Sequence, residues 1–190
     1  MIDAVAVVLA AGGSRRLGRP KQLLDYRGEP LIRHAVRVAI AAGCTRALVI
    51  QGAVEVSSLL EGLNVEVVSN EEWQEGISSS IRAAVAAAAG RRILFTTVDQ
   101  PLVTPEHLRM LLALEAPIVA TGYRAVAGIP VAFAAGLHGE LLTLRGDRGA
   151  RSVIDAHREE LAVVPFEDAA FDVDRDADYF QLLELEAGEE

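Results

Sequence analysis

VLAAGGSRRLGRPKQ, residues 8–22, begins inside an apolar run and continues into a segment with three glycines, three arginines and one lysine but no acid. The run itself, residues 4–9, consists only of alanine, valine and leucine. An unbroken apolar run of this kind is typical of a strand that is covered on both faces of a parallel sheet. The stretch therefore predicts a buried strand that leads directly into an exposed, cationic, glycine-rich loop.

Strands and helices are predicted to alternate along the rest of the chain. Short apolar runs at residues 47–50, 65–68, 93–98 and 118–120 predict four more buried strands. Residues 30–42 are apolar on one helical face and stop at Gly43, and Thr104-Pro105 is typical of a helix start. The alternation predicts an α/β fold with a mostly parallel sheet and helices on both faces. Residues 123–151 are irregular and glycine-rich, which predicts an insertion of extra strands or a lid.

Composition limits the kind of protein. The chain has 190 residues, 51% of them hydrophobic, so we expect a single domain with a sizeable core over residues 1–190. Its net charge of −9 argues against nucleic acid or an anionic membrane as a partner. Cys44 is the single cysteine, which excludes a disulfide framework and a cysteine-based metal site. With no signal-peptide pattern and no apolar run of ~20 residues, we expect a soluble cytoplasmic protein.

Polar residues gather where the predicted strands end. The segments concerned are 10–22, 69–80, 99–100 and 172–174. Ligands of open parallel sheets bind beyond the carboxyl ends of the strands. We therefore expect these four segments to form one site.

The glycine-rich loop is the candidate anion site. Gly12, Gly13 and Gly18 remove side chains, so that backbone N–H groups can form a concave nest for a phosphate. Arg16 and Lys21 are the best side-chain ligands for it. The loop is neither a P-loop, because the Lys-Ser/Thr pair is missing, nor a G-x-G-x-x-G dinucleotide loop. A plain solvated turn is the alternative, since glycine clusters are common in turns.

Aspartates supply the second half of the candidate site. Asp99 follows the strand predicted at 93–98, and Asp172 and Asp174 lie near the C-terminus. Mg²⁺ usually takes one or two protein carboxylates and completes its shell with water and phosphate oxygens, so these acids suit it. The alternatives are a loop-capping role for Asp99 and a helix N-cap at Asp174 or Asp176. The four histidines are scattered, and their spacing does not predict a zinc site.

With these motifs in place, the sequence resembles the MobA-like nucleotidyltransferases, which attach a nucleotide to the molybdenum cofactor. LAAGGSRRLGRPKQLL from Leu9 resembles the opening pattern of the family, L-A-A-G-x-S-x-R-M-G-x-x-K, with leucine in place of the usual methionine. Five further segments resemble family motifs in the same order: NEEWQEGISSSI at 70–81, DQPLV at 99–103, GIPVAF at 128–133, GDRGAR at 146–151 and DVDRDADY at 172–179. Together they are specific for the family, though less so for the substrate.

The resemblance implies a three-layer, Rossmann-like fold of the nucleotide-diphospho-sugar transferase kind and Mg²⁺-dependent nucleotidyl transfer. Arg16, Lys21 and Asp99 are the implied catalytic residues, and Asp99 and Asp174 the implied metal ligands. A terminal phosphate of a molybdopterin-type acceptor would attack the α-phosphorus of a nucleoside triphosphate and release pyrophosphate. The implied nucleotide site consists of Leu9, Ala10, Ala11, Gly12, Gly13, Ser14, Arg16, Lys21, Ser69, Asn70 and Ser79.

The resemblance also bears on nucleotide and acceptor. The AAG at residues 10–12 is similar to the branch that uses CTP, whereas the guanylyl branch tends to have Ala-Gly-Gly, so CTP is favoured over GTP. Ile129 stands where histidine is common, and RDA at residues 175–177 replaces the usual Thr-Pro-Glu, which leaves the acceptor open. The alternatives are a sugar- or alcohol-phosphate nucleotidyltransferase and a non-catalytic accessory protein of a molybdenum hydroxylase.

Overall fold

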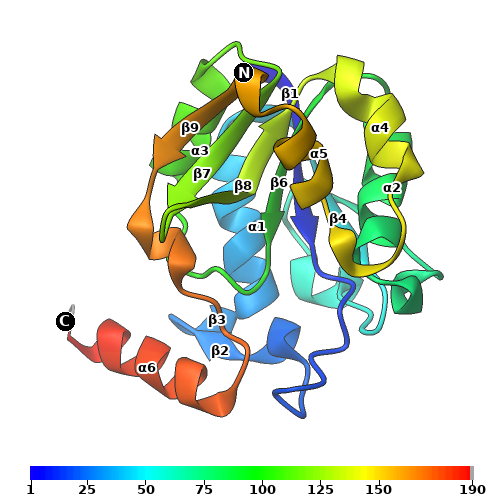
Figure 1. Ribbon diagram of the computed structural model, residues 1–190. Helices are drawn as coiled ribbons and strands as arrows, with labels where there is room; N and C mark the ends of the chain where they lie inside the picture. The colour runs from blue at the N-terminus through cyan, green and yellow to red at the C-terminus, as the bar shows by residue number, and fades with distance from the viewer. Residues whose placement is uncertain (189–190) are drawn as a thin grey trace.

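Seven strands form the central sheet of the structure, a computed structural model that describes residues 1–188. Their order is β5-β4-β1-β6-β8-β7-β9 (Figure 1). β5, β4, β1 and β6 are parallel neighbours, and β7 is parallel to β9. The bounds are β1 Ile2–Leu9, β4 Cys44–Gln51, β5 Glu66–Ser69, β6 Arg92–Thr97, β7 Ile118–Tyr123, β8 Val126–Phe133 and β9 Leu161–Pro165.

One strand breaks the parallel pattern. β8 lies between β6 and β7 and is antiparallel to both. It comes from the irregular segment 123–151, so the predicted insertion supplies an extra strand in the middle of the sheet. A separate two-stranded ribbon, β2 (Asp25–Tyr26) with β3 (Glu29–Pro30), follows the glycine-rich loop.

Helices cover both faces of the sheet, which confirms the predicted three-layer α/β fold (Figure 1). In β1, Val5, Val7 and Leu9 point to the face packed by α2, α4 and α5, whereas Ala6 and Val8 point to the face packed by α1. Successive side chains of a strand alternate between faces, so one unbroken apolar run can serve both layers. The bounds are α1 Leu31–Ala41, α2 Ile77–Ala87, α3 Pro105–Ala113, α4 His138–Thr143, α5 Arg151–Ala156 and α6 Asp176–Ala187.

The predicted helix signals are confirmed at α1 and α3. α1 ends directly before Ala42 and Gly43, and the side chain of Thr104 accepts a hydrogen bond from the His107 backbone N–H at the start of α3. In the part of the chain that the structure describes, residues 1–188, no helix combines the length and apolar character needed to span a bilayer.

α6 begins in a way that leaves Asp174 available. The carboxylate of Asp178 accepts hydrogen bonds from the backbone N–H groups of Asp174 and Arg175, at 3.0 and 2.8 Å. Arg175 is the N-cap residue, so the alternative of an N-cap at Asp174 or Asp176 is wrong. Because Asp178 satisfies the helix start, the carboxylate of Asp174 is free to face the glycine-rich loop.

Candidate active site

A cleft of about 600 Å³ opens where β1 and β6 end, with Leu9 and Thr97 in its wall. Each of the four polar segments singled out in the sequence contributes to its walls. The volume is in the usual range of small-molecule sites. The lining includes Ala11, Gly12, Gly13, Ser14, Arg16, Lys21, Trp73, Ser80, Asp99, Asp147 and Asp174.

The glycine-rich loop forms one wall as bare backbone. Gly12, Gly13 and Ser14 line the cleft, and within residues 1–188 their backbone N–H groups donate no hydrogen bond. Gly13 lies close to the indole of Trp73, since a Cβ at Gly13 would be 3.3 Å from the ring. The Ser14 hydroxyl accepts a hydrogen bond from the Lys21 backbone N–H at 3.1 Å, which closes the loop. The arrangement has the features of an anion nest.

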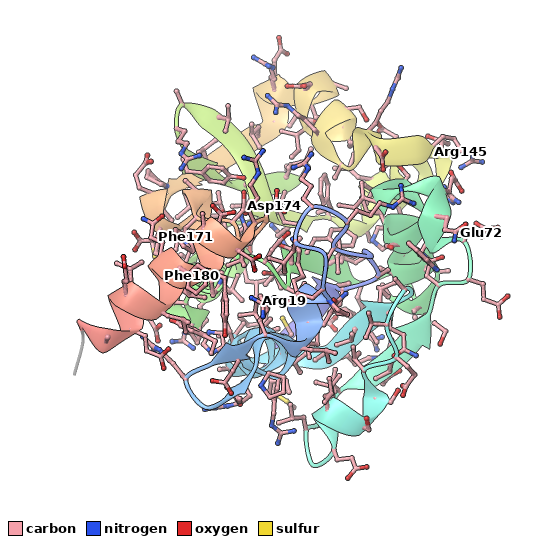
Figure 2. The ribbon with its side chains drawn as sticks, turned by 90° about the horizontal axis from the view of Figure 1, so that it is seen from below. Arg19, Glu72, Arg145, Phe171, Asp174 and Phe180 are labelled. Carbon is pink, nitrogen blue, oxygen red and sulfur yellow. The ribbon has the colours of Figure 1, made fainter. Side chains whose placement is uncertain are left out.

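Lys21 lies at the centre of the charged part of the cleft. Its Nζ donates to Asp99 Oδ2 at 2.9 Å and to Asp174 Oδ1 at 3.0 Å. Only 12% of the Lys21 side chain is exposed. Figure 2 shows Asp174 beside the N-terminal loop that carries Arg19, whereas Glu72 and Arg145 lie at the edge of the molecule in this view. Tertiary folding thus brings the cationic loop and two acids from distant segments into direct contact.

Lys21 keeps its proton in spite of its burial. Removal from water alone would lower its pKa, but the charge of Asp99 and hydrogen bonds to Asp99 and Asp174 raise the pKa above its usual value. In turn, the hydrogen bond from Lys21 holds the pKa of Asp174 below its usual value. The pKa of Asp172 is raised to about 6, first by partial removal from water and then by the charges of Asp99 and Asp174. Asp99 and Asp174 therefore pair with Lys21, whereas the charges of these two acids disfavour ionisation of Asp172.

Two loop arginines pair with the C-terminal segment. Arg16 Nη1 lies 3.1 Å from Asp174 Oδ2, with 73% of the arginine side chain exposed. Arg19 Nη2 lies 2.8 Å from Asp176 Oδ1, and its guanidinium carbon is 5.3 Å from the centre of the Tyr179 ring. Exposed ion pairs contribute little to stability. Here they connect the glycine-rich loop to the start of α6.

The carboxylates of Asp99 and Asp174 fit the ligand set of a divalent cation. Both accept hydrogen bonds from one ammonium group, so they converge on one cationic position. Mg²⁺ needs only one or two protein carboxylates. Among residues 1–188, no group of three or more His, Cys, Asp and Glu side chains is arranged to hold a metal ion. The remaining ligands would therefore come from water and substrate phosphates.

Four of the predicted nucleotide-site residues, Ala10, Ser69, Asn70 and Ser79, do not line the cleft. The Nδ2 of Asn70 donates to the hydroxyls of Ser79 and Ser80, at 2.8 and 3.0 Å. The hydroxyl of Ser69 accepts a hydrogen bond from the end of β4 at 3.0 Å, and Ala10 is buried. Of these serines only Ser80, which the sequence did not single out for the nucleotide, lines the cleft. The polar groups satisfy one another and tie the end of β5 to the start of α2.

Gln22 supports the loop in a way that the sequence interpretation missed. Its fully buried side chain donates from Nε2 to the carbonyl oxygens of Ala10 and Gly12, at 2.7 and 2.9 Å. Within residues 1–188 its Oε1 atom has no hydrogen-bond partner. Gln22 lines the cleft and holds the carbonyls of the first loop turn in place. The signal available in the sequence was an uncharged polar residue between Lys21 and the leucine pair at residues 23–24.

Comparison with known proteins agrees with the geometry of the loop and the acids. The sequence pattern of the MobA-like NTP transferase domain matches residues 6–161. The chain belongs to this family. The match begins in β1 and ends at the first residue of β9, so the MobA-like region contains the loop, Asp99 and the β8 insertion, whereas Asp174 lies beyond it.

Several relatives resemble this MobA-like chain over much of their length. Nicotine blue oxidoreductase of Paenarthrobacter nicotinovorans is 35% identical over 160 residues, which cover 76% of this chain and 78% of that protein. A probable molybdenum cofactor guanylyltransferase of Pelotomaculum thermopropionicum is 36% identical over 112 residues, 59% of this chain and 53% of that one.

Solved structures extend the comparison to nearly the whole MobA-like chain. Rv0371c from Mycobacterium tuberculosis has a TM-score of 0.85 and 32% identity, with 96% of this chain and 98% of that chain covered. A structure of Rv0371c in complex with manganese has a TM-score of 0.80, 30% identity and the same coverage. A related protein of this fold thus binds a divalent cation, and the present chain is a member of a nucleotidyltransferase family.

Proposed function

We propose that this chain transfers a nucleoside monophosphate, with CMP favoured, from a nucleoside triphosphate to the terminal phosphate of a molybdopterin-type acceptor, with Mg²⁺. The observation that carries the proposal is the position of Lys21 Nζ between Asp99 and Asp174, at 2.9 and 3.0 Å, opposite unbonded loop amides. A buried cation, two carboxylates and an anion nest around one cleft suit the charge of a metal triphosphate.

The residues of the cleft would act by positioning and by neutralising charge. The amides of Gly12, Gly13 and Ser14 bind triphosphate oxygens, and Arg16 adds a cation at the open side. An oxygen of the acceptor phosphate attacks the α-phosphorus, a new P–O bond forms, and the bond from the α-phosphorus to the bridging oxygen breaks. Pyrophosphate leaves with the electron pair, and Lys21 stabilises the charge that it gains. No general base is needed, because the attacking phosphate is already ionised.

Asp99 and Asp174 would hold the divalent cation. When bound, the ion supplies positive charge that aligns and neutralises the triphosphate. To hold the ion, Asp99 and Asp174 would have to give up at least part of their contact with Lys21, because a single position cannot hold both cations. Lys21 would then turn toward the phosphates, which are the other anionic partners in reach of the cleft.

The preference for CTP comes from the AAG segment at residues 10–12. Ala10 and Ala11 are both buried, and Ala11 lines the cleft. By similarity to the family, alanine at residue 11 accompanies CTP and glycine accompanies GTP. The relative from Pelotomaculum thermopropionicum carries the name of a guanylyltransferase, so GTP is the competing substrate.

The test is a screen of each nucleoside triphosphate against each acceptor class, with Mg²⁺ or Mn²⁺ and pyrophosphate release as the readout. We expect release only with molybdopterin and fastest with CTP. Release with a sugar phosphate instead would favour the sugar-phosphate transferase. Selective stabilisation by nucleotide with no turnover would favour the accessory protein, since a ligand at 100 times its Kd stabilises a fold by about 2.7 kcal/mol.

The name of one relative also points to oxidoreductase chemistry. The loop at residues 8–22 lacks the G-x-G-x-x-G pattern of dinucleotide-binding loops, which is why we prefer nucleotidyl transfer. The same screen therefore includes NADH and NADPH. Thermal stabilisation by either one, with none by any nucleoside triphosphate, would overturn the proposed function.

A further inference from the structure

The two carboxylates proposed as metal ligands already have a cation between them. Lys21 Nζ lies 2.9 Å from Asp99 Oδ2 and 3.0 Å from Asp174 Oδ1. The lysine side chain is largely buried, and Arg16 Nη1 approaches the other carboxylate oxygen of Asp174, at 3.1 Å from Oδ2. Part of the positive charge that a divalent ion would bring to these carboxylates is therefore supplied by the protein itself.

Lys21 needs another anionic partner if its ammonium is to leave this position. A buried ammonium that loses its carboxylates still bears the cost of its removal from water. Within residues 1–188, Asp147 is the only other acid that lines the cleft, and it lies over Gly76 at the start of α2. A divalent ion that arrives alone would therefore have to displace the ammonium without offering it a new partner.

A triphosphate offers such a partner. Gly12, Gly13 and Ser14 line the cleft, and within residues 1–188 their backbone N–H groups donate no hydrogen bond. Lys21 lines the same cleft, and phosphate oxygens are strong acceptors for a lysine ammonium. A triphosphate bound by the loop amides would thus give Lys21 new partners and leave Asp99 and Asp174 free for the ion.

The cations of a neighbouring cavity do not neutralise these carboxylates. This second, apolar cavity of about 260 Å³ lies beside the cleft, and its buried walls include Ile81, Phe95 and Val131. The residues that line both spaces are Leu9, Ile77, Thr97 and Asp147. Arg148 and Arg151 line the second cavity with exposed side chains. Within residues 1–188 the Arg148 guanidinium takes part in no hydrogen bond or ion pair, so its positive charge is close to the cleft but pairs with neither Asp99 nor Asp174.

We infer that Lys21 couples the binding of the two ligands: its ammonium keeps a divalent cation away from Asp99 and Asp174 until a triphosphate binds the ammonium. The ion then enters together with the triphosphate and not before it. Because linkage is reciprocal, the ion must in turn strengthen triphosphate binding by the same factor. The inference rests on the proposed function and names the regulation of its metal site.

The first experiment measures Mn²⁺ binding to the protein without nucleotide, by electron paramagnetic resonance. Lys21→Met removes the ammonium, and Arg148→Met is its control, because it removes the same charge without freeing a carboxylate. We expect Lys21→Met to bind Mn²⁺ about tenfold or more tightly than wild type, and Arg148→Met to bind it as wild type does. The gain should disappear when Asp174→Asn is added to Lys21→Met. An equal affinity of wild type and Lys21→Met would overturn the inference.

Two further proteins keep the test decisive if Lys21→Met does not fold. Lys21→Arg retains the charge and should bind Mn²⁺ as weakly as wild type. Asp174→Asn alone reports the weak binding of Mn²⁺ to other acids, and wild type should bind no more tightly than this variant. Wild-type binding tenfold or more tighter than that of Asp174→Asn would show that Lys21 does not exclude the ion.

The second experiment measures the coupling itself. Inorganic tripolyphosphate, which carries no base, is titrated into the protein by calorimetry, once with EDTA and once with saturating Mg²⁺. Formation of the Mg²⁺–tripolyphosphate complex in solution is the same for each protein, so it cancels when the two affinity ratios are compared. Mg²⁺ should strengthen tripolyphosphate binding about fivefold or more in wild type relative to Lys21→Arg148-independent controls such as Lys21→Met, whereas equal ratios would refute the coupling.

The inference and the proposed function can fail separately. If the Mn²⁺ and tripolyphosphate results hold while no nucleoside triphosphate supports turnover with any acceptor, the proposed function fails and the coupling by Lys21 stands. If turnover occurs while Lys21→Met changes neither Mn²⁺ affinity nor the effect of Mg²⁺, the coupling fails and the proposed function stands.

Discussion

The charged cleft and the apolar second cavity share a wall, yet their cationic side chains differ in burial. In the cleft the cation is inside: Lys21 is almost buried and is held by Asp99 and Asp174. At the cavity the cations are outside, where Arg148 and Arg151 remain in water around an apolar interior. A buried charge needs partners within the protein, whereas a charge at an opening stays free for a ligand. The difference separates a cleft whose cation is held by carboxylates of the protein from a cavity whose cations face water.

His107 shows what burial does to a cation without such partners. Its side chain is 2% exposed, and its Nε2 lies 2.8 Å from the hydroxyl of Thr121. Burial lowers the pKa of His107 to about 4, because no carboxylate offsets the loss of water. Lys21 is also largely buried, but Asp99 and Asp174 raise its pKa. The carboxylates, and not burial as such, therefore decide whether a cation persists in this fold.

The largest expected effect comes from Asp99→Ala, which removes one carboxylate from the cleft and leaves the second cavity intact. We expect pyrophosphate release to fall by about 10³-fold or more, since aligned charge stabilisation is the main catalytic contribution in such sites. Asp155→Ala, at a surface carboxylate paired with Arg158, is the control and should keep full activity. Residual turnover of Asp99→Ala within tenfold of wild type would contradict the metal assignment.

Lys21→Met tests the pairing itself. Turnover should fall about 10²-fold, and the pKa of Asp174, followed by NMR titration, should rise, because its main hydrogen-bond donor is gone. In the wild type the pKa of Asp174 is lower in the folded state than in the unfolded state. The ionised carboxylate therefore stabilises the fold at pH values above the unfolded pKa, and this contribution is lost as the pH falls through the folded pKa. The variant should lose that acid sensitivity. Lys21→Arg, which retains the charge, is the control, and an unchanged Asp174 pKa in Lys21→Met would disprove the coupling.

His107→Gln sharpens the comparison between paired and unpaired buried cations. With a folded pKa of about 4 against the usual histidine value of 6.5, His107 contributes stability that is complete above pH 6.5 and is lost as pH falls toward 4. The full loss in the free energy of unfolding is about 3 kcal/mol. Urea unfolding at a series of pH values should therefore show a shallower acid loss for His107→Gln. His157→Gln is the control, because carboxylates raise the pKa of His157 and its contribution has the opposite pH dependence. Parallel curves for wild type and His107→Gln would refute the prediction.

Gly76→Ala has the smallest expected effect and acts where the two spaces meet. Gly76 has a φ of +119°, and a Cβ there would collide with Asp147 Oδ1 and lie 2.7 Å from the Gly146 carbonyl oxygen. The substitution should lower the free energy of unfolding by roughly 1–3 kcal/mol and weaken nucleotide binding, because Gly76 lines the cleft. Gly136→Ala, with open space around the added Cβ, is the control. Unchanged stability and unchanged nucleotide binding of Gly76→Ala would contradict this expectation.

Much of the fold was accessible from local patterns. Continuous apolar runs predicted β1, β4, β5, β6 and β7, and the Thr104-Pro105 pair predicted the start of α3. Runs of this kind predict strands correctly because a strand covered on both faces has to be apolar throughout. β8 was not defined as a strand, because its residues lie in a glycine-rich segment and its antiparallel place in the sheet depends on β6 and β7.

The candidate site was predicted in part. Lys21, Asp99 and Asp174 were named from the loop, the strand end and the late acids, and the structure places them within hydrogen-bond distance. Asn70 and Ser79 were expected at the nucleotide but bond to one another and do not line the cleft. A sequence shows which residues are polar but not which polar groups are already satisfied, and that depends on packing.

By itself the sequence determined that strands lead into a bare cationic loop and into acids, because apolar periodicity and glycine act over a few neighbouring residues. Only the tertiary structure decided that Lys21 meets Asp174, 153 positions away, and that an apolar cavity opens next to them. Both outcomes depend on the order of strands in the sheet and on the β8 insertion, which no local pattern encodes. Residue type thus set which charges lie in the cleft, and topology set which of these charged side chains pair with one another.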